Sequence, residues 1–172
     1  MMNFRHQRKR GRLLYTRYEW QMDIIKADKS SFEDVKKITQ TTIMEIYPKY
    51  YPPGAVEFFL KHHSDESIVS DIEDGKVYLL IDGGDVVGTV TISENDINRL
   101  FVMPHCQHKG YGRTLLDFAE KEILKNYSFV EMDASLPAKR IYRKRGYKET
   151  EYNTVKTDNG DYLCYDVMRL ER

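Results

Sequence analysis

Residues 107–112 read Gln-His-Lys-Gly-Tyr-Gly, with the apolar run 100–104 before them and a helical pattern after them. The loop therefore joins a strand to the N-terminus of a helix. The first amides of a helix lack intrahelical acceptors and lie at the positive end of the helix dipole, so anions bind there. Glycine at 110 and 112 permits positive φ and removes a Cβ that would keep a phosphate away. The pattern favours a phosphate-binding loop over a turn that simply needs two glycines.

Basic side chains at the same helix start support this interpretation. Lys109 and Arg113 place positive charge where it opposes the helix dipole, so they do not serve stability there. The planar guanidinium of Arg113 also suits a diphosphate. We therefore expect the backbone amides of residues 108–113 to hold a diphosphate.

Two common nucleotide-binding loops fit this sequence poorly. The Walker pattern, which needs Gly, four residues and then Gly-Lys-Ser/Thr, is absent. The dinucleotide fingerprint lacks its third glycine because Leu115 stands there, although Glu131 lies where a ribose-binding acid is expected. Three consecutive predicted strands also precede the loop, whereas the dinucleotide fold begins with it. A dinucleotide-binding oxidoreductase stays as an alternative.

The composition predicts one globular domain behind a basic N-terminal arm. The 172 residues are 41% apolar and 31% charged, and no run reaches the roughly 20 apolar residues of a membrane span. The first twelve residues, MMNFRHQRKRGR, hold five Lys or Arg and no acid. We expect residues 1–20 to be disordered or outside the domain. Residues 21–172 are expected to form a single domain.

Charge and cysteine usage narrow the class of protein. The net charge of zero leaves residues 21–172 acidic, which argues against nucleic-acid binding. The N-terminus has no apolar run long enough for a signal peptide. Cys106 and Cys164 form no metal-ligand pair in the sequence. We therefore expect a cytoplasmic protein that holds no metal and does not bind a membrane.

Hydrophobic periodicity predicts the elements on either side of the loop. A strand over 22–27 precedes two helices, the first with a capping box over 30–34 and the second opening at 53–56. A short third helix covers 64–72. The remaining pattern predicts helices after 110 and over 137–145, strands over 76–81, 85–92, 97–102, 129–134, 147–157 and 162–170, and hairpin turns at 82–85 and 158–161. The main order is β-α-α-β-β-β-α-β-α-β-β, an α/β fold with a sheet of mixed direction.

The segment from Asp96 to Tyr147 resembles the GNAT superfamily of acetyl-CoA-dependent N-acetyltransferases. The signature loop of that family, Gln/Arg-x-x-Gly-x-Gly/Ala, matches residues 107–112, and its helix ending in Tyr-x-x-x-Gly-Phe/Tyr matches residues 142–147. The resemblance implies a mixed, mostly antiparallel central sheet flanked by helices, with acetyl-CoA as co-substrate. Ser135 stands where the family often has an asparagine that bonds the pantetheine. The acetyl-CoA-binding residues that the resemblance implies are Leu100, Phe101, Val102, Gln107, His108, Lys109, Gly110, Tyr111, Gly112, Arg113, Thr114, Ser135, Ala138 and Tyr142.

Acetyl transfer from a thioester to an amine needs a deprotonated amine, donors for the oxyanion and a proton for the leaving thiolate. The resemblance implies Tyr142 as the general acid, because a phenol with an ordinary pKa of about 10 is protonated at neutral pH. Asp96 matches the glutamate that some relatives use as a base through a water. Glu94 and Glu131 are alternatives, and a solvated acid with no dedicated base also stays open.

The acceptor site is expected between the first helices and the last hairpin, over 46–59 and 158–164. Its aromatic character suits a peptide N-terminus, an aryl or aliphatic amine, or an amino acid, although Phe58 and Phe59 are expected mainly to pack the helices. His62 and His63 point in different directions and are expected at the surface or in the acceptor-site lining. Cys106 is expected to be a small packing residue rather than a nucleophile.

The sequence thus predicts an N-acetyltransferase that moves an acetyl group by direct attack of a primary amine. The acceptor is a small molecule, an amino acid or a peptide, and the protein is a monomer or a homodimer. The alternative is a non-catalytic acyl-CoA-binding sensor or partner module, which the serine at 135 and the open identity of the base suggest.

Overall fold

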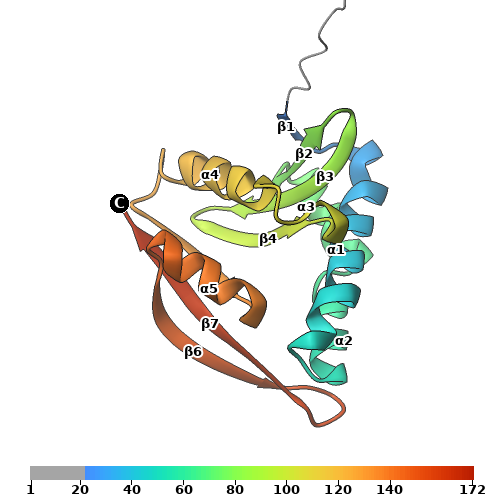
Figure 1. The fold of residues 1–172 in the computed structure, drawn as a ribbon, viewed down its shortest axis with the longest axis vertical. Coiled ribbons are helices and arrows are strands. Elements are labelled where there is room, and N and C mark those ends of the chain that lie inside the picture. The colour runs from blue at the N-terminus through green and yellow to red at the C-terminus, as the bar shows by residue number, and fades with distance from the viewer. Residues whose placement is uncertain (1–21) are drawn as a thin grey trace, which may run out of the picture.

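The computed structural model describes residues 22–172, so the predicted basic arm over 1–20 lies outside the described residues (Figure 1). The strands are β1 (Asp23–Lys26), β2 (Val77–Asp82), β3 (Asp85–Ser93), β4 (Asp96–Val102), β5 (Phe129–Ala134), β6 (Lys148–Lys156) and β7 (Tyr162–Glu171). The helices are α1 (Phe32–Ile46), α2 (Pro53–His62), α3 (Asp65–Glu73), α4 (Tyr111–Ile123) and α5 (Leu136–Arg145), with 3-10 turns η1 (Lys29–Ser31), η2 (Tyr47–Lys49) and η3 (Pro104–Cys106). The predicted order is confirmed, and α3 is the short helix expected over 64–72.

The strands form one sheet in the order β1-β2-β3-β4-β5-β7-β6. All neighbouring pairs are antiparallel except β4 and β5, which are parallel, so the predicted mixed and mostly antiparallel sheet is confirmed. β4 and β5 pair in register only at Asp96 and Glu131, where the Glu131 N–H donates to Asn95 C=O at 2.9 Å. Beyond this point the two strands make no further ladder pairs, so they diverge. The sheet is therefore two halves joined at one end of a seam between β4 and β5.

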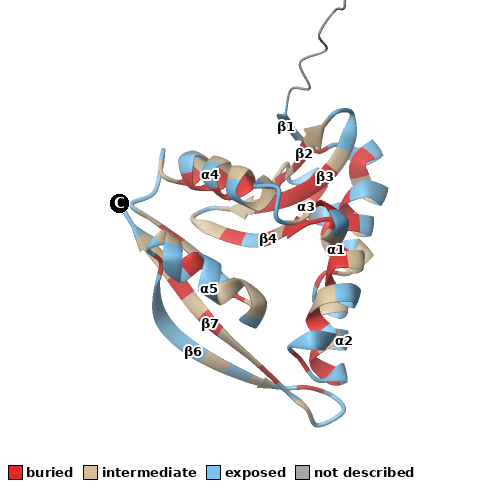
Figure 2. Ribbon diagram, in the orientation of Figure 1, coloured by how far each residue is buried: buried red, intermediate tan, exposed pale blue. Residues whose placement is uncertain are grey.

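Alternation along β2 places helices on both faces of the sheet. Val77 and Leu79 are buried in a cluster with Val35 of α1 and Ile68 of α3. The ring of Tyr78, between them, packs edge-on against Phe118 of α4 with centroids 4.9 Å apart. Because successive side chains of a strand point to opposite faces, α1 and α3 cover one face and α4 covers the other. Figure 2 shows buried residues on both sides of these strands.

The capping box lies earlier than predicted. The Asp28 carboxylate accepts from Ser30 N–H at 2.8 Å, and the Ser31 hydroxyl accepts from Asp28 N–H at 3.2 Å, so the box caps η1. Ser31 is also the N-cap of α1, where it makes no side-chain cap bond. The hydroxyl that was expected to cap α1 is used one turn earlier, because η1 intervenes between β1 and α1.

Other predicted boundaries hold. Pro53 begins α2, and Gly146 ends α5 with φ of 103°. Such a left-handed C-cap favours glycine. Within residues 22–172, no helix combines the length and the apolar character that crossing a bilayer requires.

Candidate active site

The loop before α4 presents a row of backbone amides. His108 and Gly110 have φ of 65° and 94°, and Tyr111 begins the helix. Thr114 N–H donates to Gly110 C=O at 3.0 Å, but the amides of residues 108–113 donate to no acceptor among the residues that the structure describes. A Cβ on Gly112 would meet only Val102 Cγ2 at 3.8 Å, so protein packing does not require glycine there. The loop has the open amides and the free space that an anion needs.

A groove of about 240 Å³ runs from this loop to α5. It brings together most of the residues predicted to bind acetyl-CoA, namely Leu100, Phe101, Val102, Gln107, His108, Tyr111, Gly112, Ser135, Ala138 and Tyr142. Four predicted residues lie outside its lining: Lys109, Gly110, Arg113 and Thr114. These four belong to the outer part of the loop and the first turn of α4. The Ser135 side chain makes no cap bond at the start of α5, although Ser135 is the N-cap residue there.

The strand β4 directs selected backbone groups into the groove. Met103 N–H donates to Val87 C=O at 3.0 Å, and hydrogen-bonded pairs recur every second residue in an antiparallel ladder, so Phe101 exchanges bonds with Thr89. The backbone of Phe101 is thus engaged in the sheet. Leu100 and Val102 point their N–H and C=O groups toward the separated part of the seam. Gln107 Nε2 donates to Val102 C=O at 3.2 Å, as does Thr42 Oγ1 at the same distance. This leaves the Leu100 groups and the Val102 N–H facing the groove.

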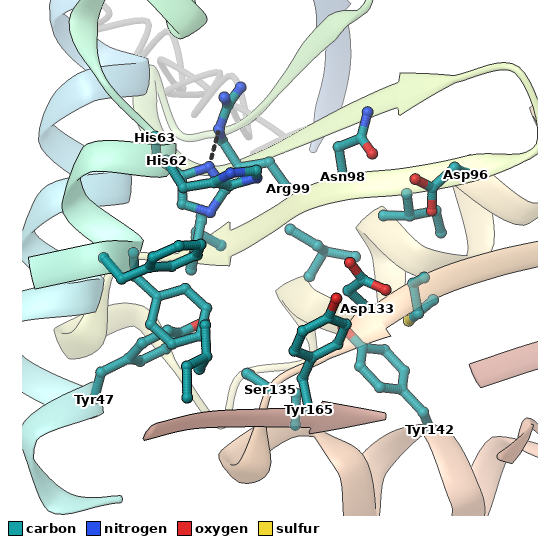
Figure 3. Close-up of a pocket in the computed structure, with 18 of the residues that line it drawn as sticks. Tyr47, His62, His63, Asp96, Asn98, Arg99, Asp133, Ser135, Tyr142 and Tyr165 are labelled. Atoms are coloured by element: carbon teal, nitrogen blue, oxygen red, sulfur yellow. Dashed lines mark hydrogen bonds between the residues drawn. The ribbon is translucent and has the colours of Figure 1, made fainter. Parts of the chain in front are cut away.

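A second cleft of about 200 Å³ meets the first (Figure 3). Their linings share Tyr47, Leu100, Phe101, Ser135, Ala138 and Tyr142. Only the second cleft is lined by residues of α2, of β5 and of the last hairpin, and β4 lines both cavities. The two cavities therefore adjoin, and Tyr142 lies in the wall that they share.

Tyr142 is 9% exposed and has no hydrogen-bond partner for its hydroxyl among residues 22–172. Burial raises the pKa of this phenol above its ordinary value, so it stays protonated at neutral pH. The end of its helix is fixed to α4. Arg145 pairs with Glu120 at 2.6 Å, and Tyr147 donates to Glu120 at 2.9 Å. The Tyr-x-x-x-Gly-Tyr pattern thus combines a buried tyrosine that lines both cavities, a left-handed C-cap and an anchor to α4.

Two carboxylates line the second cleft. Burial, reinforced by Asp133 and Glu131, raises the pKa of Asp96 to about 6. Burial and Glu131 also raise the pKa of Asp133. Asp96 is on β4 and Asp133 on β5, so the divergence of these strands opens the space between them. Figure 3 shows both side chains within the cleft.

The alternative bases are placed elsewhere. Glu131 pairs with Arg169 at 2.7 Å, and Glu94 lies in the turn between β3 and β4 with φ of 56°. Neither lines the cleft. Cys106 is buried in the main core, in agreement with the packing role expected for it.

A polar group at the other end of the cleft involves His63, which follows α2. His63 is 6% exposed and lines the cleft together with His62, so of the two positions expected for the pair, surface or cavity lining, His63 takes the second. Arg99 Nε donates to His63 Nδ1 at 3.4 Å, while its Nη1 pairs with Asp71 at 3.1 Å. Burial and Arg99 lower the pKa of His63 to about 3.

Aromatic rings form one wall of the cleft. Phe59 packs edge-on against Tyr47 at 4.7 Å between centroids, and Phe58 stacks on His62 at 6.2 Å. These rings pack the helices as expected and also line the cleft. The last hairpin supplies the facing wall through Val155, Leu163 and Tyr165, of which only Leu163 lies in the stretch 158–164 that was predicted. Its tip is tied to α2, because Asp161 Oδ2 accepts from Gly54 N–H at 2.9 Å.

Sequence reasoning missed several lining residues. Asp133 alternates with buried Met132 and Ala134 in β5, so the pattern did mark it as facing away from the core. Arg99 carried no signal, because a charged residue in a strand is normally expected to be exposed. Thr42 and Ile46, four residues apart on α1, line the groove and were read only as helical periodicity.

The family of the chain follows from these features. The model of the acetyltransferase (GNAT) domain matches residues 46–163, which is more than half of the chain. The chain therefore belongs to the GNAT acetyltransferases. No curated protein matches its sequence.

Solved structures share the fold at low sequence identity. A GCN5-related N-acetyltransferase from Rhodopseudomonas palustris superimposes with a TM-score of 0.79 at 20% identity, over 87% of this chain and 95% of that one. The PaiA N-acetyltransferase from Thermoplasma acidophilum, in complex with coenzyme A, gives 0.67 at 20% identity over 88% and 99%. YncA, a putative acetyltransferase from Salmonella typhimurium with acetyl-CoA, gives 0.68 at 17% identity over 88% and 94%.

Proposed function

We propose that this protein is an N-acetyltransferase that moves an acetyl group from acetyl-CoA directly to a primary amine. The observation that carries the proposal is the row of unpartnered amides over 108–113 at the mouth of a groove that ends at Tyr142. These amides would hold the diphosphate, and the Leu100 backbone would pair with the pantetheine arm. Matching structures with coenzyme A and acetyl-CoA support this placement.

The two cavities suggest how the reaction proceeds. The amine enters through the second cleft and attacks the thioester carbon, so the new C–N bond forms as the C–S bond breaks. Tyr142 gives its proton to the leaving thiolate, and Asp96 takes the proton that the amine releases. At pH 7 a carboxyl with a pKa of about 6 is mostly ionised and is basic enough to serve. The Leu100 N–H is a candidate donor to the oxyanion.

Ligand stabilisation and turnover test the proposal together. Because a ligand raises stability by mass action, coenzyme A should raise the melting temperature while NAD should not. Release of coenzyme A from acetyl-CoA should then depend on an added amine. Protection by NAD alone would favour the oxidoreductase alternative. Coenzyme A binding without turnover over a broad amine panel would favour a non-catalytic acyl-CoA-binding module.

The proposal includes a cytoplasmic setting and an amine acceptor that is a small molecule or a peptide. Cys106 and Cys164 are both free, which suits a reducing compartment.

A further inference from the structure

His63 presents a fixed hydrogen-bond donor to the acceptor cleft. Its Nδ1 accepts from Arg99 Nε, and a guanidinium can only donate. The single proton of the neutral ring must therefore be on Nε2. The lowered pKa of His63 keeps the ring neutral at every pH at which the enzyme would work.

The partners of Arg99 hold this tautomer in place. Nη1 of Arg99 contacts Asp71 at 3.1 Å and Thr91 Oγ1 at 2.9 Å, and Nη2 donates to Ser67 Oγ at 3.4 Å. The guanidinium thus has its charge compensated by Asp71 and its direction set by three side chains. The guanidinium therefore cannot rotate away from His63 to allow the tautomer that is protonated on Nδ1.

The Nε2–H of His63 has no acceptor among residues 22–172, although the side chain is more than nine-tenths buried and lines the cleft. Nε2 lies across the ring from Nδ1, so it faces away from Arg99. Nε2 is not among the buried side-chain atoms that lack a partner, so it is reached from the cleft and can donate there to an oxygen acceptor of a ligand.

The charge of the cleft restricts that ligand further. Asp96 and Asp133 line the cleft, and no Lys or Arg contributes to the pKa of either, although His62 lowers that of Asp133. Arg99 also lines the cleft, at the end where His63 lies, but its charge is compensated by Asp71. A cationic amine is therefore attracted, whereas a carboxylate is repelled. A neutral donor in a negative cleft suits a neutral carbonyl oxygen.

We propose that His63 selects acceptors in which the reactive amine is accompanied by a neutral carbonyl, as in an amino-acid amide or a peptide N-terminus. The inference rests on the proposed acetyl transfer. His63 is here a specificity-determining residue: it binds the acceptor oxygen through Nε2–H and takes no part in bond making.

Three amines with one aromatic body test the proposal: phenylalaninamide, phenylalanine and phenethylamine. They differ only in the substituent on the carbon that bears the amine, which is a carboxamide, a carboxylate or a hydrogen. The rings of Tyr47, Phe58 and Tyr165 line the cleft and can pack against the phenyl ring that all three share. We expect kcat/KM to be about tenfold or more higher for the amide than for phenethylamine, because the latter offers no acceptor to the His63 donor and displaces the water that could otherwise bond it. Phenylalanine should be the poorest. A tripeptide that begins with Phe, used as well as the amide, would identify peptide N-termini; use of the amide alone would identify small amino amides.

Two variants separate the donor from the structural role of the ring. The side-chain oxygen of Asn and Nδ1 of His are each two bonds from Cβ. His63→Asn therefore keeps an acceptor for Arg99 but removes the donor at the position of Nε2. The amide of Gln reaches as far as Nε2, so His63→Gln keeps a donor for the cleft. We expect the preference for phenylalaninamide over phenethylamine to disappear in the Asn variant and to persist in the Gln variant.

The outcomes distinguish this inference from the proposed function. Equal use of the amide and phenethylamine by the wild type, or an undiminished preference in His63→Asn, would overturn the role of His63 while leaving acetyl transfer intact. If none of these amines were acetylated while other amines of a broad panel were, this inference alone would be overturned. If no amine of the panel were acetylated, the proposed function and this inference would both be overturned.

Discussion

Tyr142 is a polar group that the fold keeps buried and without a partner. Its hydroxyl is reached from the groove and the cleft, and it contributes little to stability because no residue among 22–172 bonds it. Its position at the junction of the groove and the cleft is where a leaving thiolate would need a proton. The chemistry proposed for it therefore depends on a single oxygen atom.

Replacement of Tyr142 by phenylalanine should remove that oxygen and little else. We expect kcat to fall about 100-fold, as is usual for loss of a general acid, with little change in the KM for acetyl-CoA. The melting temperature should not fall, since no described hydrogen bond is lost. Release of coenzyme A measures the first effect and thermal unfolding the second.

Tyr165→Phe is the matched control, because Tyr165 lines the cleft but not the groove. It should retain most of the activity. An unchanged rate in Tyr142→Phe would take Tyr142 out of the mechanism.

Asp96 combines a functional role with a cost in stability. Its carboxyl loses its proton near its ordinary pKa of 3.8 when unfolded and at about 6 when folded. Because the folded state holds the proton more tightly, the wild type loses stability as the pH rises from about 4 to about 6. Asp96→Asn lacks this loss. We expect it to be more stable above pH 6 by about 1 kcal/mol, allowing for partial exposure, yet at least about tenfold less active.

Unfolding in urea at pH 4 and at pH 7 checks the first expectation, since the advantage of Asp96→Asn should be present only at pH 7. The pH profile of kcat/KM checks the second, since the acidic limb near pH 6 should vanish. Asp85→Asn, at the exposed start of β3, should change neither. If Asp96→Asn were less stable than the wild type at pH 7, burial of the ionised Asp96 carboxylate would not cost the folded protein stability.

At the scale of elements, the loop and α5 could be predicted because their signals are local. Gly110 and Gly146 adopt the left-handed conformations that favour glycine, and both lie at helix ends where the hydrophobic period changes. The hairpin turns at 82–85 and 158–161 were equally visible. The capping box was misplaced because a 3-10 turn and a helix start share the same serine-rich signal.

The walls of the cleft depend on contacts that local patterns do not record. Gly54 is an example: the sequence suggested only the start of a helix, but a Cβ there would come within 2.0 Å of Asn159 Oδ1. The glycine allows the tip of the last hairpin to lie against α2, where Asp161 accepts from its N–H. The contact joins positions more than one hundred residues apart.

Gly54→Ala should displace the hairpin. Alanine favours a helix by about 1 kcal/mol over glycine, but the clash should cost more, so we expect a net destabilisation of about 1 kcal/mol. Because the hairpin lines only the second cleft, the KM of the acceptor should rise several-fold while that of acetyl-CoA stays constant. Steady-state kinetics with each substrate varied in turn separates the two.

Asn159→Ala provides the internal control, because it removes the side chain that obstructs the new methyl group. In a double-mutant cycle, Gly54→Ala should cost less in the Asn159→Ala background than alone. If the changes in unfolding free energy were strictly additive, the methyl group at position 54 would not clash with the Asn159 side chain.

For the whole molecule, the decisive feature is the seam between the halves of the sheet. The sequence predicted β4 and β5 as separate strands but could not reveal that they pair at Asp96 and Glu131 and then diverge. Nor could it show that Asp133 would face Asp96 or that His63, Arg99 and Asp71 would meet. Such contacts arise from how the elements assemble, and a single sequence records the elements more clearly than their assembly.

The seam makes a prediction about backbone exchange. Phe101 N–H is paired with β3, whereas Leu100 N–H faces the open seam, so the two neighbours should differ in the free protein. Acetyl-CoA should slow hydrogen exchange at Leu100 by about tenfold or more as the pantetheine pairs with it, while Phe101 should change only by the overall gain in stability. Amide-resolved exchange by NMR, with NAD as the control ligand, measures both. Equal protection of the two amides would mean that the ligand stabilises the fold without pairing with β4, and the placement of the pantetheine in the seam would then be wrong.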